Sequence, residues 1–137
     1  MKTKILLLTG KVLASIIIVL GVIHNIATFT PLIQEGLVCL LLKDLKAVTY
    51  TSLICGSSFI LSGVLLMVLF RNVEEYPFLN TTIIIIGAFL AFCGILSVIY
   101  MFGNPFAWIA LILNNIMFAI SIGLKINYNH ESSTHEK

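Results

Sequence analysis

Four long apolar runs, separated by short polar segments, dominate the chain. They cover residues 12–29, 50–70, 81–102 and 106–124, and none of them contains Asp, Glu, Lys or Arg. A helix needs about 20 apolar residues to cross the roughly 30 Å hydrocarbon core of a bilayer. The runs do not alternate apolar with polar residues, as the strands of a membrane barrel do. The pattern therefore predicts an all-α bundle of four transmembrane helices.

Turn signals separate the predicted spans. Tyr76 and Pro77 indicate a turn before the third span, with Asn80 as the expected N-cap of that helix. Gly103, Asn104 and Pro105 indicate a tight connection to the fourth span, with Pro105 in its first turn. The predicted topology is thus four spans joined by short connections, apart from the longer link between the first two.

That link, residues 30–49, contains an apolar stretch of about 12 residues, which is too short to span a bilayer. Thr30 as N-cap and Pro31 at the first helical position predict a short amphipathic helix between the first and second spans. Two positions stay open for residues 31–42: flat in the membrane interface, or folded back over the bundle. A fifth span is less favoured because Gln34 and Glu35 interrupt the apolar stretch.

Composition supports a membrane protein and excludes several soluble classes. Of the 137 residues, 59% are hydrophobic and 10% are charged, whereas soluble domains average about 45–50% and about 25%. This number of charged side chains is too small to cover the surface of a soluble globule of this size, which excludes a soluble enzyme. The high hydrophobic content excludes a disordered chain. The same composition excludes a disulfide-stapled secreted module. Cys39, Cys55 and Cys93 are odd in number and lack the C-x-x-C spacing that is typical of a thiol–disulfide membrane enzyme.

The distribution of basic residues predicts the orientation. Four spans place both termini and the middle connection on one side, which holds six basic residues; the other side holds only Lys43 and Lys46. The positive-inside rule then puts both termini in the cytoplasm. Lys11 interrupts the first apolar run, so we expect a retained first span rather than a cleaved signal peptide. The polar residues 127–137 are expected to form a disordered tail.

His24 is the one ionisable side chain within a predicted span. Polar groups at such depth are costly in lipid and usually face the bundle interior. Gly21, His24 and Thr28 share one helix face, and Asn25 lies beside them. His24 is therefore either a neutral imidazole bonded to a neighbouring helix or a ligand-binding, haem-ligating or proton-handling group.

The candidate ligand-binding residues are His24, Asn25 and Thr28 together with three further polar residues, Glu35, Asn114 and Asn115. Asn114 and Asn115 lie at the middle of the fourth span, where amides either bond neighbouring helices or line a pocket opposite His24. Adjacent residues differ by about 100° around a helix, so these two amides must point in different directions. Glu35 either remains solvated or folds back to pair with His24, which would raise the basicity of the imidazole.

Other chemistry has no support in the sequence. There is no Gly-rich phosphate loop, no Ser-His-Asp set and no aromatic-basic surface for nucleic acid. One histidine and one glutamate do not supply a tight metal site. We therefore expect no catalytic residue, cofactor, metal or nucleic-acid partner, and regard an enzyme as the less favoured class.

Residues 21–31, GVIHNIATFTP, resemble the first-helix segment of small bacterial four-helix membrane proteins of unknown function. Those segments carry a G-x-x-H pattern, here Gly21 and His24, followed by a turn that contains a proline, here Pro31. The resemblance covers about a fifth of the chain. It implies a four-helix bundle in a bacterial inner membrane and supplies no activity or ligand.

Three functional hypotheses follow. Small residues recur every three or four positions along the third span, as at Gly87, Ala91 and Gly94, and such faces allow close helix packing. They favour a non-enzymatic protein, either an accessory subunit of a membrane-protein partner or a homo-oligomer. The alternative is binding or transport of a small apolar or protonatable ligand in a pocket around His24. A membrane enzyme with His24 as base and Glu35 as orienter is the third.

Overall fold

The computed structural model describes the backbone of residues 2–135 and the side chains of residues 3–31, 34–35 and 37–128. Within that part the chain is all-helical, and its elements follow one another in the order α1 (Lys2–Ala27), α2 (Pro31–Gln34), the 3-10 turn η1 (Glu35–Leu37), α3 (Leu42–Asn72), α4 (Leu79–Tyr100) and α5 (Pro105–His135).

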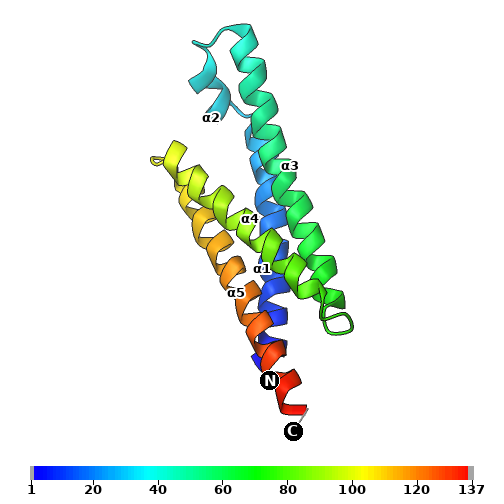
Figure 1. Ribbon diagram of the computed structural model, residues 1–137. Coiled ribbons are helices and arrows are strands. Elements are labelled where there is room, and N and C mark those ends of the chain that lie inside the picture. The colour runs from blue at the N-terminus through cyan, green and yellow to red at the C-terminus, as the bar shows by residue number, and fades with distance from the viewer. Residues whose placement is uncertain (1, 136–137) are drawn as a thin grey trace.

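The four long helices form two antiparallel hairpins, α1 with α3 and α4 with α5 (Figure 1). Both termini and the α3–α4 connection lie at one end of the molecule. The α2 turn and the α4–α5 connection lie at the other end, which we call the α2 end. Toward the α2 end, α3 diverges from the α4–α5 hairpin, and the two hairpins are in closest contact nearer the termini (Figure 1).

Each long helix contains a segment that is long and apolar enough to cross a membrane. These segments are Thr3–Ala27, Leu42–Asn72, Leu79–Tyr100 and Pro105–Tyr128. The four predicted spans are therefore confirmed as helices, and the chain has the architecture of a multi-pass membrane protein.

Helix ends differ from the predicted span ends because charged and polar residues do not stop a helix. α1 begins at Lys2 rather than near residue 12, since lysine is a good helix former. α3 begins at Leu42 rather than near residue 50, so it extends about 12 Å further. α5 continues to His135, through residues expected to form a disordered tail, because no Gly or Pro follows Gly123. Residues 136–137 of that tail lie outside the described residues.

The link between the first two spans differs from the single short amphipathic helix that we expected. Thr30 is the N-cap and Pro31 opens the helix, as predicted, but α2 has only four residues and is followed by the three-residue turn η1. The Thr30 hydroxyl donates back to the Ala27 carbonyl, at 2.7 Å, rather than capping α2. An isolated helix of about 12 residues is marginal even without a glycine, and Gly36 lies in the middle of this one.

Both predicted turns beside α4 are present, but the residues predicted to begin the following helices have different outcomes. α4 begins at Leu79 with Phe78 at the N-cap, so Asn80 is not the cap and lies buried in the first turn. Pro105 does begin α5, and the Asn104 side chain accepts a hydrogen bond from the Phe106 amide, at 2.9 Å. Asn104 is therefore the N-cap, as expected for an asparagine just before a helix.

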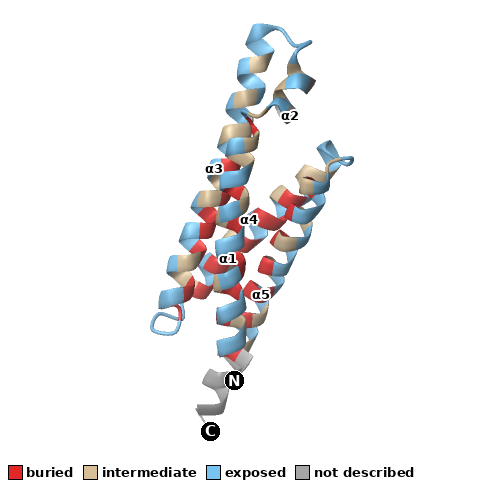
Figure 2. Cartoon of the chain, turned by 180° about the vertical axis from the view of Figure 1, so that it is seen from behind, coloured by how far each residue is buried: buried red, intermediate tan, exposed pale blue. Residues whose placement is uncertain are grey.

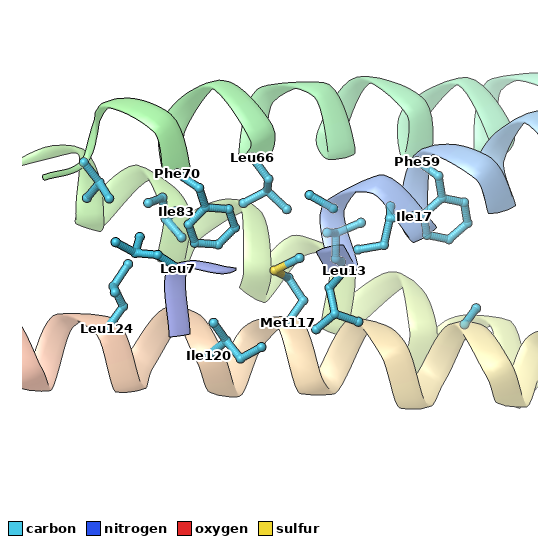
Figure 3. Packing of buried hydrophobic residues seen from close by; sticks show 14 residues of the cluster. Leu7, Leu13, Ile17, Phe59, Leu66, Phe70, Ile83, Met117, Ile120 and Leu124 are labelled. Carbon is cyan, nitrogen blue, oxygen red and sulfur yellow. The ribbon is translucent and has the colours of Figure 1, made fainter. Parts of the chain in front are cut away.

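Buried residues form one stripe along each long helix, toward the centre of the bundle (Figure 2). Apolar side chains from all four helices meet there, with Leu66, Ile83 and Met117 fully enclosed (Figure 3). Along α5 the buried positions recur every three or four residues, at Ala107, Ala110, Asn114, Met117, Ser121 and Leu124. The outer surfaces are apolar as well, which suits contact with lipid chains.

Glycines bring the paired helices into backbone contact. A Cβ atom on Gly21 would lie 2.6 Å from the Gly56 carbonyl oxygen, and one on Gly63 would lie 2.9 Å from the Ala14 carbonyl oxygen. In the other hairpin, a Cβ on Gly94 would lie 2.9 Å from the Leu111 Cα. Small residues in both hairpins are therefore used for packing within the chain.

Candidate functional site

A polar cluster joins α1 to α3 near the α2 end. The Ser52 hydroxyl lies 3.1 Å from Nε2 of His24 and 2.7 Å from Oγ1 of Thr28. The Thr28 hydroxyl also donates to the His24 carbonyl, at 2.9 Å. We call these three residues the His24 cluster. It links the predicted pair His24 and Thr28 through a serine that the sequence analysis did not select.

Helix periodicity explains why His24 and Thr28 face α3. The buried stripe of α1 runs through Ala14, Ile17 and Gly21 at steps of three and four, and the next two steps are His24 and Thr28. Thr28 is only 1% exposed, whereas His24 and Ser52 are half-buried. The cluster thus has a fully enclosed side at Thr28 and an accessible side at the imidazole.

The α2 turn is tied to the same cluster. The Gln34 side-chain amide donates to the Thr28 carbonyl, at 2.7 Å. Gln34 also lines an open groove of about 410 Å³, together with Phe29, Glu35 and Leu45. Gln34 thus connects the groove to the Thr28 backbone, and His24, Thr28 and Ser52 do not themselves line the groove.

The His24 ring reaches the second hairpin. It lies 5.6 Å, centroid to centroid, from the ring of Phe106, which is the second residue of α5. His24 is therefore level with the α4–α5 connection, where the Trp108 indole donates to the Phe102 carbonyl, at 2.9 Å. Tryptophans concentrate at the membrane–water boundary. This places His24 nearer the end of a span than its centre.

Asn25 does not join the His24 cluster. Its amide nitrogen donates to the Ser57 hydroxyl, at 3.3 Å, and its Oδ1 atom is buried with no hydrogen-bond partner among the described residues. That oxygen occupies the space beside Gly56, where a Cβ atom would lie against it. Asn25 thus acts in packing α1 against α3, one helix position away from the cluster.

Asn114 and Asn115 point in different directions, as predicted. Asn114 is 1% exposed, and its Nδ2 has no hydrogen-bond partner in the described part of the chain. It lines a cavity of about 10 Å³ together with Phe59 and Phe106. Asn115 is exposed and donates to the Leu111 carbonyl of its own helix, at 2.8 Å. Of the two, Asn114 alone lies inward, and it shares the lining of this cavity with Phe106, the residue whose ring contacts His24.

Glu35 does not pair with His24. The carboxylate is exposed in the groove, and no hydrogen bond or ion pair joins it to His24 among the described residues. Ser52 occupies the position beside Nε2 that the proposed carboxylate would have taken. The described residues also contain no group of three or more His, Cys, Asp or Glu side chains able to hold a metal ion.

Comparison with known proteins found no matching family model, no matching curated protein and no matching solved structure. The chemistry of the site therefore rests on its own geometry.

The sequence analysis missed Ser52, Gln34 and Phe106, and a signal was present for the first. Ala14 packs against Gly63, and Gly21 packs against Gly56. A step of seven residues forward along α1 therefore corresponds to a step of seven residues backward along the antiparallel α3. Continuing this register by one turn brings Ser52 level with the residues around His24. Pairs of small residues spaced by seven in both spans would have indicated that register.

Proposed function

We propose that this chain is a multi-pass protein of a bacterial inner membrane, with both termini in the cytoplasm and the α2 end on the opposite side. The distribution of basic residues between the two ends of the bundle supports this orientation by the positive-inside rule. Arg71 and Lys125 lie at the termini's end and Lys43 and Lys46 at the other. The resemblance of residues 21–31 to first helices of small bacterial membrane proteins supports the same assignment.

Cys39 offers a test of this orientation because it is exposed at the α2 end, whereas Cys55 and Cys93 lie within spans. A membrane-impermeant maleimide added to intact spheroplasts should label wild-type protein, and Cys39→Ala should abolish the labelling. Labelling of intact spheroplasts would place the segment from α2 to the start of α3 on the non-cytoplasmic side of the inner membrane. Labelling of Cys39 only after the spheroplasts are lysed would mean the opposite orientation.

We further propose that the protein binds or carries a small protonatable ligand at the His24 cluster, without catalysing a reaction. The observation that carries this proposal is the half-buried imidazole, which is held on one side by Ser52 and lies level with the end of a span. Such a group is fixed in position and is reachable from the interface. The groove lined by Gln34, of about 410 Å³, is in the size range of small-molecule sites.

A binding role fits the partners of His24 better than catalysis does. The hydroxyls of Ser52 and Thr28 are both used in bonds that join the helices, and the carboxylate of Glu35 is not beside the imidazole. A His-based enzyme would need a base and an orienting group in contact. Asn114 is a further candidate for the site, since it lines a small cavity with Phe106 and its amide nitrogen has no hydrogen-bond partner among the described residues.

Helix-mediated association is the second candidate, as an accessory subunit or as a homo-oligomer. The divergence of the hairpins toward the α2 end favours it, and large apolar side chains of α3 and α4, such as Ile54 and Ile99, are exposed. The small-residue faces support it less than the sequence suggested, since Gly21, Gly56 and Gly94 pack within the chain. We therefore rank ligand binding first.

Thermal unfolding of the protein in lipid nanodiscs tests the binding proposal. The protein is screened against amines, alcohols and carboxylic acids of equal alkyl length, because a ligand that binds only the folded state raises the melting temperature. We expect at least one compound to stabilise wild type and Asn115→Ala but not His24→Ala. Equal shifts in all three proteins would reject a site at His24, and a stable cross-linked dimer in native membranes would favour association.

A further inference from the structure

The hydrogen bonds of the His24 cluster determine where the imidazole carries its proton. Three side-chain contacts lie within hydrogen-bond distance: Thr28 with the His24 carbonyl, Thr28 with Ser52, and Ser52 with Nε2 of His24. Each hydroxyl has one hydrogen to donate, and a carbonyl oxygen can only accept. The His24 carbonyl also accepts the Thr28 backbone amide, at 3.1 Å, and its contact with the Thr28 hydroxyl is a second bond when that hydroxyl donates its hydrogen there.

The remaining assignments follow in sequence. With the Thr28 hydrogen already used, the Ser52 hydroxyl must donate to Thr28 Oγ1. The contact between Ser52 and His24 is then a bond only if Nε2 carries a hydrogen and donates it to Ser52 Oγ. In the opposite tautomer Ser52 would donate to Nε2, and one of the two short Thr28 contacts would have no hydrogen. Three bonds therefore require a proton on Nε2 and a lone pair on Nδ1.

The Nδ1 atom is also reachable. No described residue donates a hydrogen bond to it, and it is not among the buried side-chain atoms of the described residues that lack a partner. Nδ1 of His24 is therefore not fully buried. The cluster thus holds the imidazole by Nε2 and presents the Nδ1 lone pair.

We infer that His24 binds its ligand through this lone pair, so that the ligand is a hydrogen-bond donor bearing an apolar chain: a primary amine in its protonated form, or an alcohol. The inference rests on the proposed binding function. Between the two donors, the position of His24 in the last turn of α1 favours the ammonium group, because the C-terminal end of a helix carries partial negative charge.

¹⁵N NMR of the full chain in nanodiscs of neutral phospholipid tests the proton on Nε2 and the lone pair on Nδ1. A protonated ring nitrogen and one with a lone pair have distinct chemical shifts. Labelled histidine gives signals from three residues, and His24→Gln identifies those of His24 by their loss. We expect a protonated Nε2 and an unprotonated Nδ1. Ser52→Ala should abolish this preference, whereas Ser97→Ala, which affects a bond within α4, should leave it unchanged.

Four probes of equal chain length then test the ligand class. Decylamine and decanol carry a donor, whereas decyltrimethylammonium and decyl methyl ether match them in charge and length without one. We expect the first two to shift the Nδ1 signal, decylamine at the lower concentration, and the other two to leave it in place. His24→Gln keeps an amide donor toward Ser52, so it should fold normally and lose the stabilisation by decylamine in thermal unfolding.

The outcomes separate the inference from the function on which it rests. A proton on Nδ1, or equal responses to probes with and without a donor, would overturn the donor class even though a ligand binds. The expected tautomer with no response to any of the four probes would overturn binding at His24 itself, and the inference with it.

Discussion

The two hairpins use the same means of packing but differ in how they treat polar side chains. Both bring backbones together at glycines, Gly21 against Gly56 in the first and Gly94 against Leu111 in the second. In the first hairpin, some polar side chains bond their own helix, but others bond across to the partner helix, as His24 does with Ser52 and Asn25 with Ser57. In the second, Asn115 and Ser121 bond carbonyls of their own helix.

This difference shows where polar groups hold the bundle together and where they do not. Cross-helix bonds position the His24 cluster, since an imidazole held by one nitrogen has a fixed orientation. The second hairpin supplies an apolar wall, with Phe106 against the imidazole. Its one inward amide in mid-span, Asn114, has a nitrogen with no partner in the described part of the chain. The first hairpin thus builds the site and the second encloses it.

Gly21→Ala should have the largest effect on stability. Its Cβ would lie 2.6 Å from the Gly56 carbonyl oxygen, so the backbones of the first hairpin must separate. Overpacking of this kind costs about 1–3 kcal/mol, measured as the free energy of unfolding in mixed micelles. Gly123→Ala is the control, because its nearest neighbour outside its own helix would be Leu6 Cδ1 at 3.7 Å. Equal stability of the two variants would contradict the close approach of α1 and α3.

Asn114→Leu should raise stability, in contrast to most core substitutions. The change replaces a buried amide whose nitrogen lacks a partner in the described structure, and an unsatisfied buried group of this kind costs about 1–3 kcal/mol. We expect a gain of about 1 kcal/mol in the free energy of unfolding. Asn115→Leu, on the exposed side, should change it little. A loss of stability in Asn114→Leu would contradict this, because it would mean that the buried amide makes a stabilising hydrogen bond.

Ser52→Ala should have the smallest effect on stability and a larger one on binding. Interhelical hydrogen bonds in membranes average about 0.6 kcal/mol, so the variant should unfold only slightly more readily than wild type. Ser97→Ala, which removes a bond within α4, should be close to neutral. A ligand that stabilises wild type should stabilise Ser52→Ala less, because the imidazole is no longer oriented. Unchanged stabilisation would separate Ser52 from the site.

The sequence predicted the four helices and the direction of several side chains for clear physical reasons. Apolar runs of span length have few alternatives in a bilayer. Helix periodicity placed Thr28 on the same face as His24 and required Asn114 and Asn115 to point in different directions. The extensions of α1 and α3 beyond their apolar runs were not predicted, because hydropathy marks where lipid lies and not where a helix stops. The polar cluster was predicted only in part, since Ser52 becomes a neighbour of His24 through the register of two helices.

The link between α1 and α3 shows a similar limit. Thr30 and Pro31 correctly marked where a helix begins, because capping depends on adjacent residues. The length of α2, and the bond from Gln34 to Thr28, depend on contacts with the end of α1. Local patterns do not contain that information, so the sequence left two positions open for Glu35. The structure has the exposed one, while its neighbour Gln34 bonds to Thr28 of the His24 cluster.

Native mass spectrometry of the protein released from its own membranes tests the central claim most directly. Wild type, His24→Gln and Asn115→Ala are purified in parallel, and the small molecules that remain bound are compared. The account predicts one bound species with a hydrogen-bond donor in wild type and Asn115→Ala, and its loss from His24→Gln. The same bound species at equal occupancy in all three proteins would contradict a binding site at His24.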